Sequence, residues 1–556
     1  MNIMTMIGSG LKGTRARLLS ALFATTLLLP LGAQLTYAQS APAPQATTQS
    51  AAPAATPAPV PFDGKAVYDA AFKDLMDNHY TLVTPAARAA FAAKWEHKHD
   101  NDGALSTEKG TDIAVYEMMW SLGQRFDYYF PPVQTQHEHE QMNATMAGIG
   151  LSLKEDGLVK AIKALGDKPT NAQVEPLLKL SDERPLVAGD TPDSDTPAGR
   201  AHIARGDRIV AVDGVSVNGE TIDQVVSKVR GTVGSKVTLT ISHTDKNGKV
   251  TTAPVVLTRA KIILHVVKTD YEGRIAHIRM SNFESQFGTN EMGQALETAG
   301  QKAAGVVLDL RGNPGGSLSQ VIQIAQMFID EGVIMKQVER DGDHMVTITY
   351  SLTHDKFIIS AQSDDGSPAQ VQEGKRIPML LPATTPVIVL IDEGSASASE
   401  ILSGTLQANH RARIMGQPSY GKGVGQVVVQ LPSGRSMHVT SFEFLPGGVK
   451  MDWVGIVPDI EVKQPADADP LDDPSTDAQL NAAKLELIET AIGNPSPERP
   501  AAEMAARRAE LEKAHHDAFA KEVLDRQEML KKAADEAAKG IAPVIAPPTA
   551  PTAPKK

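Results

Sequence analysis

The segment Pro386-Val-Ile-Val-Leu-Ile-Asp-Glu-Gly-Ser-Ala-Ser-Ala-Ser-Glu-Ile401 joins a run of apolar residues to a small polar loop and then to helix-forming sequence. The apolar run predicts a buried strand, and the pattern after it predicts a helix that begins at Ser397 and ends near Asn409. A second unit of the same order starts with Gly305-Val-Val-Leu-Asp-Leu310, which is followed by a glycine loop and a helix opened by Ser317. Repeated units of strand, loop and helix predict an α/β core.

A lysine between two glycines follows the first unit, in Tyr420-Gly-Lys-Gly-Val-Gly-Gln426. Lys422 lies 25 residues after Ser397, and neither motif contains a histidine. A serine hydroxyl is a poor nucleophile until a base takes its proton, and a lysine that burial keeps neutral can be that base. The two motifs therefore favour a serine nucleophile with Lys422 as its base, and Ser395, Ser397 and Ser399 are the candidates on chemistry alone. The alternative is structural, because Ser397 and Glu400 also form a capping-box sequence at a helix start.

The start of this helix also offers a site for the negative charge of a reaction intermediate. Backbone N–H groups are unpaired at a helix N-terminus, and the amide of Ala398, directly after the serine, is the natural first donor. A second donor has to come from another loop. In Arg311-Gly-Asn-Pro-Gly-Gly316, Gly315 or Gly316 lets the backbone approach a substrate closely, and the sequence does not choose between them.

Composition limits the classes of function. The chain has 556 residues, a formal net charge of −12 and no cysteine. The negative charge argues against nucleic acid as a partner, since phosphate neutralisation needs a basic surface. Residues 1–38 have the basic, apolar and small-residue order of a signal peptide, so we expect a periplasmic protein that begins near Gln39 and has no membrane span after signal cleavage. The Pro/Ala-rich residues 39–61 predict a disordered linker.

Short strands separated by glycine turns predict a mostly β domain over residues 137–262. The turn at Asp213-Gly214, a helix near 221–229 and a hairpin around Asn247-Gly248 follow the order of a PDZ domain, which this region resembles apart from an insertion over about 164–197. The resemblance implies that a glycine loop captures the terminal carboxylate of a peptide, which adds to the domain as a strand. The residues expected to bind the peptide are Gly148, Ile149, Gly150, Leu151, Leu153, Val225, Val226 and Val229.

Four motifs in order resemble those of the carboxyl-terminal processing peptidases, also called tail-specific proteases. They are the serine motif, the lysine motif at its spacing, Asp309-Leu-Arg-Gly-Asn-Pro-Gly-Gly316 and Gly455-Ile-Val-Pro-Asp-Ile460. The resemblance chooses Ser397, the middle one of three closely spaced serines, and it implies that Gln426 orients the lysine by hydrogen bonding. It also implies an exported serine endopeptidase that needs no metal and no organic cofactor. Its partners would be protein or peptide substrates with free, apolar C-termini, together with an adaptor or a second copy of the chain.

The expected fold class is multi-domain α/β with a crotonase/ClpP-like catalytic core. The expected order is signal peptide (1–38), disordered linker (39–61), N-terminal helical region (62–136), PDZ domain with an insertion (137–262), peptidase core (263–465), helical C-terminal region (466–540) and disordered tail (541–556).

The sequence leaves other functions open. A catalytically inert PDZ protein would bind peptides with the same domain order, and a crotonase-like acyl-transfer enzyme would use the glycine oxyanion loop without Ser397 or Lys422. A Ser/His/Asp hydrolase would need a histidine base, but His410 and His438 lie in no recognisable triad motif.

Overall fold

The computed structural model describes residues 62–132, 134–135, 147–155, 161, 175–189, 191–245, 247–262, 265–465, 474–491, 493 and 496–538. The expected signal peptide, linker and disordered tail lie outside these residues, as does much of the expected insertion. The chain forms two compact units, one made by residues 136–264 and the other by the residues before and after them.

The larger unit contains a mostly parallel sheet with a fully buried centre. Every residue of its two central strands, β12 and β17, is buried, as expected for parallel strands that are covered on both faces. β10 pairs antiparallel with β11, and the remaining pairs are parallel. In spatial order the strands are β10 (Val267–Glu272), β11 (Ile275–Met280), β12 (Gly305–Asp309), β17 (Val387–Ile391), β18 (Arg413–Gly416) and β21 (Ile460–Glu461).

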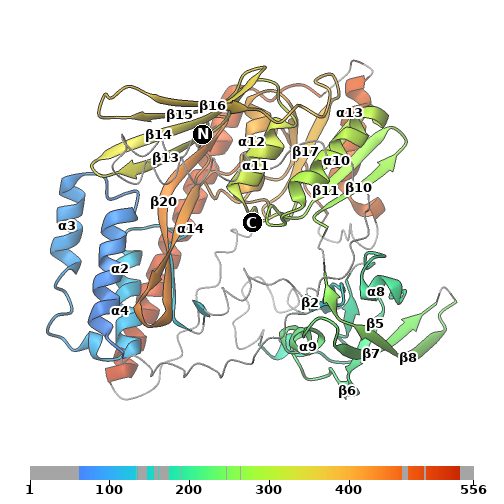
Figure 1. The fold of residues 1–556 in the computed structure, drawn as a ribbon, viewed down its shortest axis with the longest axis horizontal. Coiled ribbons are helices and arrows are strands. Elements are labelled where there is room, and N and C mark those ends of the chain that lie inside the picture. The colour runs from blue at the N-terminus through green and yellow to red at the C-terminus, as the bar shows by residue number, and fades with distance from the viewer. Residues whose placement is uncertain are drawn as a thin grey trace, which may run out of the picture. The chain divides into compact units, whose positions relative to one another are not determined.

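A second, antiparallel sheet lies across the same helices, so this part of the larger unit has a sheet–helix–sheet arrangement (Figure 1). Apolar side chains of both sheets and of the three helices between them form one core, while α13 packs on the outer face of the parallel sheet. The helices are α10 (Gly288–Lys302), α11 (Leu318–Gln326), α12 (Ala398–Ala408) and α13 (Ala478–Ala491). The antiparallel strands are β1 (Tyr128–Phe130), β13 (Gly332–Asp341), β14 (His344–Leu352), β15 (Lys356–Ser363), β16 (Gln370–Lys375), β19 (Val424–Leu431) and β20 (Arg435–Pro446).

The N-terminal helices of the larger unit share a core with its antiparallel sheet. Their buried apolar side chains pack against Leu431, Met437 and Val439 at the β19–β20 hairpin. Threonine caps open two of these helices, since Thr84 and Thr107 each accept a hydrogen bond from the amide three residues later. The helices are α2 (Gly64–Asn78), α3 (Pro85–Trp95) and α4 (Glu108–Trp120); a long C-terminal helix, α14 (Ala501–Ala538), belongs to the same unit.

The described residues of the smaller unit contain a six-stranded antiparallel sheet and the amphipathic helix α9. The strand order is β3-β4-β5-β7-β8, with β6 paired to β5, and β2 pairs with β9. α9 begins with a complete capping box between Thr221 and Gln224. The elements are β2 (Ala147–Gly148), β3 (Leu153–Glu155), β4 (Leu186–Ala188), α8 (Pro197–Arg200), β5 (Arg208–Val212), β6 (Val215–Ser216), α9 (Ile222–Val229), β7 (Lys236–Thr244), β8 (Val250–Thr258) and β9 (Ala260–Lys261).

Candidate active site

Ser397 lies between β17 and α12 in an unusual backbone conformation. Its φ and ψ are +54° and −113°. Capping serines are normally extended, as is Ser317 before α11 with φ −64° and ψ 123°. A non-glycine residue at positive φ is strained and is held there by its surroundings, which is common in active sites. A capping role alone therefore does not explain the conformation of Ser397.

The two neighbouring serines serve the structure of the loop before α11. Both are 0% exposed. Ser395 donates to the carbonyl of Leu310 at 2.8 Å, and Ser399 donates to the carbonyl of Asn313 at 2.9 Å. Ser397 is partly exposed. Among these three serines, it alone combines solvent access with a strained backbone.

The buried carboxylate of Glu400 joins the serine motif to the lysine motif. Its Oε2 accepts hydrogen bonds from the amides of Ser397 at 2.8 Å and Lys422 at 3.0 Å. Its Oε1 accepts from Ser419 Oγ and from the amide of Gly421, both at 2.6 Å. Since two of these bonds end on one atom, the amide nitrogens of Ser397 and Lys422 lie no more than about 6 Å apart.

The charge state of Glu400 follows from these contacts. Burial raises the pKa of the carboxyl above its ordinary value, and the four hydrogen bonds oppose that rise because each donor favours the anion. A carboxylate can accept all four donors at once, whereas a protonated carboxyl would have to donate from one oxygen. We therefore take Glu400 as ionised.

Lys422 places its amine against an aromatic ring. The residue is partly exposed, but Nζ lies 5.2 Å from the centroid of Phe126. Burial lowers the pKa of Lys422, the charge of Glu400 raises it, and the charge of Arg125 lowers it again, so the pKa lies below the ordinary value. A lower pKa increases the fraction of the neutral amine, which is the form that can accept a proton.

The glycine loop after β12 lies directly against the serine. Gly315 has φ +102°, and a Cβ there would lie 2.8 Å from Ser397 Cβ and 2.9 Å from the amide nitrogen of Ala398. Gly316 has φ +141° and is packed against Phe283. The amide of Gly315 donates to Asn313 Oδ1 at 2.9 Å, which holds the loop in its turn. Both glycines are thus needed for close backbone approach.

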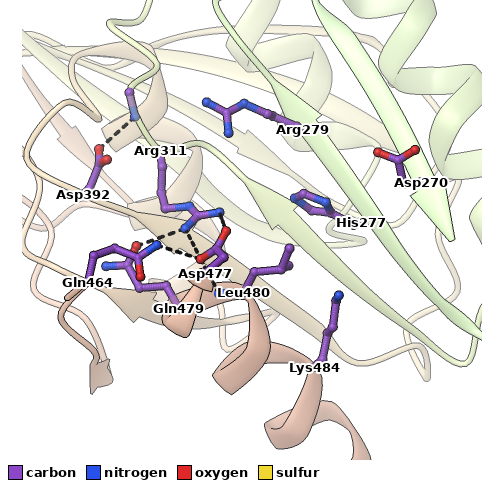
Figure 2. Close-up of a pocket in the computed structure, with 11 residues that line it drawn as sticks. Asp270, His277, Arg279, Arg311, Asp392, Gln464, Asp477, Gln479, Leu480 and Lys484 are labelled. Atoms are coloured by element: carbon purple, nitrogen blue, oxygen red, sulfur yellow. Dashed lines mark hydrogen bonds and ion pairs between the residues drawn. The ribbon is translucent and has the colours of Figure 1, made fainter. Parts of the chain in front are cut away.

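A buried charge network supports the base of this loop (Figure 2). Arg311 donates to Asp309 at 2.9 and 2.7 Å and to both carboxylate oxygens of Asp477 at 2.8 Å. Although burial alone would raise the pKa of Asp309, hydrogen bonds from Arg311 and His277 hold it well below the usual range. Asp477 lies immediately before α13, so the C-terminal helical region contributes directly to the support of this glycine loop.

The same network borders a cavity of about 560 Å³ between α13 and the edge of the parallel sheet. Its charged lining carries both signs and includes Arg279, Lys484, Asp270 and Asp392 (Figure 2).

Gln426 lies in β19 at a register irregularity, opposite Thr440. Its Nε2 is buried and has no hydrogen-bond partner among the described residues, and no bond to Lys422 is seen in that part of the chain. The two histidines of the alternative triad lie elsewhere. His410 follows the far end of the 11-residue helix α12, roughly 16 Å along the axis from its start. His438 lies in β20 against the rings of Tyr128 and Phe130.

The residues expected to bind a peptide divide into core and surface in the smaller unit. Ile149, Val225 and Val229 are 2%, 0% and 7% exposed and belong to its core. Leu151 and Leu153 are only partly buried against that core, and Val226 is also partly exposed. Gly148 ends β2, and Gly150 has φ +71°. β3 ends the order of the sheet, so one of its edges has no strand partner within the described residues.

Sequence reasoning missed three residues that matter to this geometry. Glu400 was interpreted only as a cap, although its carboxylate also holds the lysine loop. Arg125 and Asp477 carry no motif that marks them. Among the described residues there is no cluster of ligands suited to a metal ion, and none of their helices is long and apolar enough to cross a membrane.

Comparisons with known proteins identify the family of the chain. The model of peptidase family S41 matches residues 274–462, and a PDZ-domain model matches residues 190–242. A carboxyl-terminal-processing protease of Picosynechococcus sp. is 32% identical over 389 residues, which are 69% of this chain and 80% of the relative.

Two further likenesses cover other shares of the chain. A carboxy-terminal-processing protease of Bartonella bacilliformis is 32% identical over 295 residues, and the match spans 52% of this chain and 61% of that relative's length. Among solved structures, a photosystem II D1 C-terminal processing protease is 23% identical, with a TM-score of 0.40, and the match covers 73% of this chain and 95% of that one.

Proposed function

The chain belongs to the carboxyl-terminal processing proteases of peptidase family S41, and we propose that it is a serine endopeptidase with a catalytic dyad of Ser397 and Lys422. The family and the fold class predicted from the sequence are confirmed by the matches to the S41 and PDZ models and to the relatives. One observation carries the dyad. A single oxygen of Glu400 accepts hydrogen bonds from the amides of both residues and so fixes the two motifs relative to each other.

In the proposed mechanism, Ser397 Oγ attacks the carbonyl carbon of the scissile peptide while Lys422 Nζ takes the hydroxyl proton. Lys422 then gives this proton to the leaving amine, and water releases the acyl group with Lys422 again acting as the base. The amides of Ala398 and of Gly315 or Gly316 would stabilise the oxyanion. If Gly315 is the second donor, its amide has to leave Asn313 Oδ1, to which it donates. If Gly316 is the second donor, the bond from Gly315 to Asn313 can stay in place. These steps use protein groups and water alone.

Gln426 keeps its proposed role as the residue that orients Lys422. Its support in the structure is the buried Nε2 without a partner in the described part of the chain, because such a group is costly unless another state uses it. Gln426→Ala should therefore reduce turnover less than Lys422→Ala, since it removes orientation and leaves the proton acceptor in place.

A serine-reactive probe tests the dyad. The parent protein should be labelled and should cleave an unfolded protein, whereas Ser397→Ala should do neither and Lys422→Ala should lose turnover with its melting temperature largely kept. Ser403→Ala is a matched control for the serine, because Ser403 is buried in the same helix and only bonds the helix backbone. Lys450→Ala, whose side chain is exposed, is the control for the lysine. Proteolysis by Lys422→Ala at the parental rate would refute the dyad.

The same experiment separates the alternatives. An inert PDZ protein would show no labelling and no proteolysis in the parent, while a crotonase-like acyl-transfer enzyme would keep its activity in Ser397→Ala. Inhibition of proteolysis by a metal chelator would also contradict the mechanism.

For substrate recognition, we propose that an apolar C-terminal tail adds to β3 beside α9. The open edge of β3 supports strand addition, and the partly exposed Leu151, Leu153 and Val226 could contact the tail's side chains. The loop Gly148–Gly150 would bind the terminal carboxylate. An unfolded substrate with a free C-terminus should be cleaved faster than the same substrate with an amidated C-terminus, at concentrations below saturation. Equal rates would remove the tail from the recognition mechanism.

We also propose that the protein is exported to the periplasm and matures near Gln39, because residues 12–38 have the order of a signal peptide. N-terminal sequencing of the protein from fractionated cells tests this. A cytoplasmic protein that starts at Met1 would contradict it. The predicted domain boundaries remain part of the same proposal, with the dyad inside residues 263–465.

A further inference from the structure

A buried arginine from the N-terminal region lies beside the lysine motif. Arg125 is 8% exposed and follows α4 in the chain. Its guanidinium donates to the carbonyl of Gly421, the residue before Lys422. It also packs on aromatic rings, at 4.5 Å from the centroid of Phe126 and 4.4 Å from that of Trp453. This arrangement ties segment 124–127 to the loop that carries the base.

Arg125 and Lys422 lie against the same ring. The ammonium nitrogen is 5.2 Å from the Phe126 centroid and the guanidinium carbon is 4.5 Å from it, so the two cations are no more than about 10 Å apart. Two like charges this close, with an aromatic ring between or beside them, disfavour each other's charged form. Because a guanidinium does not lose its proton in proteins, the lysine is the group that must become neutral.

The other charges near the pair act in both directions. Glu400, from α12, favours the charged form of Lys422, and Arg125 opposes it. Asp452, Tyr420, Glu400 and Tyr128 in turn favour the charge of Arg125. Asp452 also accepts from the amide of Gly423 at 3.0 Å, and it comes from the loop before Trp453. His515 of α14 faces the same region, and burial lowers its pKa, which keeps it neutral.

The C-terminal helix α14 holds in place the aromatic ring on which Arg125 packs. His515 Nδ1 lies 2.6 Å from the carbonyl oxygen of Trp453, and the ring of His516 stacks on the indole at 4.3 Å. Trp453 has φ +64°, so its backbone is held in a conformation that such a bulky residue rarely adopts. The indole on which Arg125 rests is thus fixed by a helix outside the matched peptidase region.

We propose that Arg125 is a positioning residue of the dyad, which holds the Lys422 loop through Gly421 and favours the uncharged form of the lysine amine by placing a second, permanent cation beside it. The inference rests on the proposed function, in which Lys422 is the base. It explains how the dyad can place an ionised Glu400 near its base without losing the base to protonation. The carboxylate fixes the two backbones, and the arginine offsets its charge.

The pH dependence of kcat/KM tests the proposal. Two unit charges about 10 Å apart, at an effective dielectric constant of about 20, shift each other's pKa by about one unit. Arg125→Gln should therefore move the acid midpoint of activity upward by about one pH unit, because an uncharged neighbour no longer opposes protonation of Lys422. The rate at the alkaline plateau should also fall, because the Lys422 loop loses the bond from the guanidinium to the carbonyl of Gly421. Arg125→Lys keeps the charge and should keep the parental midpoint.

Arg340→Gln is the matched control, because Arg340 is also part-buried and donates to a backbone carbonyl, that of Met76, away from the dyad. It should leave the midpoint unchanged. A parental midpoint in Arg125→Gln, with or without a lower rate, would overturn the inference and leave Arg125 a structural residue. If Arg125→Gln does not fold, Arg125→Met replaces it, because methionine is similarly long and uncharged. Failure of both neutral variants to fold would likewise leave Arg125 a purely structural residue. Activity in Lys422→Ala would instead refute the proposed base, so the two failures can be told apart.

Discussion

The strongest prediction concerns Glu400→Gln, a change of one oxygen for one amino group at the centre of the dyad. Each carboxylate oxygen of Glu400 accepts two hydrogen bonds, one pair from the amides of Ser397 and Lys422 and one pair from Ser419 and Gly421. A glutamine has one accepting oxygen, so its NH₂ group must take the place of the other carboxylate oxygen. In the better orientation the NH₂ group faces Ser419 Oγ, which can accept a hydrogen bond, and the amide of Gly421, which cannot. The variant then loses the bond from Gly421, which becomes an unfavourable donor–donor contact.

The cost follows from the strength of charge-assisted bonds. Each bond to an ionised group contributes roughly 1.5–3 kcal/mol, so the one lost bond corresponds to about 1.5–3 kcal/mol. If that energy is lost from the arrangement that holds the lysine loop beside Ser397, kcat/KM should fall about 10- to 100-fold. Relief by a shift of the lysine loop would produce the lower end of this range, and the shift itself would separate the dyad.

The assay is the kcat/KM for cleavage of an unfolded protein, measured beside the rate of labelling by a serine-reactive probe and the melting temperature. Glu393→Gln is the matched control, because it is the same substitution in the same loop at an exposed residue. It should stay within threefold of the parent. If Glu400→Gln also stays within threefold, the carboxylate does not hold the dyad and the reasoning from its four bonds is wrong.

Three further predictions follow from other parts of the site. In the parent, kcat/KM should rise from acid to alkaline pH with a midpoint below the ordinary lysine pKa of about 10.4, because the pKa of Lys422 is lowered and its neutral amine is the proposed base. A profile without a fall in activity at acid pH would exclude lysine as the base. Asp477→Asn should lower kcat about 10- to 100-fold with KM within threefold, because Arg311 loses one charge-assisted partner under the glycine loop at 311–316. Asp517→Asn, at an exposed ion pair of α14, should change neither constant, and a loss confined to KM would contradict the support of the loop by Asp477. Gly315→Ala should abolish labelling in a protein that still binds tail peptides, because the new Cβ would lie 2.8 Å from Ser397 Cβ; parental labelling would show that the loop does not approach the serine.

Local sequence patterns predicted the parts of the fold that local forces determine. The expected strands at 305–310 and 386–391 match β12 and β17 because uninterrupted branched apolar residues can only be buried on both faces. The helix expected from Ser397 to about Asn409 corresponds to α12. The hairpin around Asn247-Gly248 corresponds to β7 and β8, which pair over their whole length.

The antiparallel sheet of β13 to β16 was not predicted, although its turns carry a signal. Gly342 and Gly366 have φ +65° and +80° at the hairpins, and β14 alternates between buried and less buried residues. That alternation is typical of a strand with one face on a core. The sequence could thus have indicated hairpins, but their position on α11 and α12 depends on contacts between segments far apart in the chain.

The function of Glu400 shows why the site was only partly predictable. A capping box is a local pattern, and the interpretation was right about the bond from the amide of Ser397. The other three donors lie 19 to 22 residues further along, and no spacing rule connects them with a helix start. A pattern that looks sufficient for a structural role can therefore conceal a catalytic one whenever the same atom has non-local partners.

The lysine base shows the same limit from the other side. A lysine motif states where the amine is, but the pKa of the amine depends on its surroundings, and part of those surroundings comes from outside the matched peptidase region at 274–462. Phe126 and Arg125 come from the segment before the smaller unit, and Trp453, though inside the region, is held by α14. The two residues of the proposed dyad lie in the core, but the aromatic rings and the second cation near Lys422 depend on both ends of the chain. We therefore expect the flanking helical regions to influence the pKa of Lys422, because they position these residues.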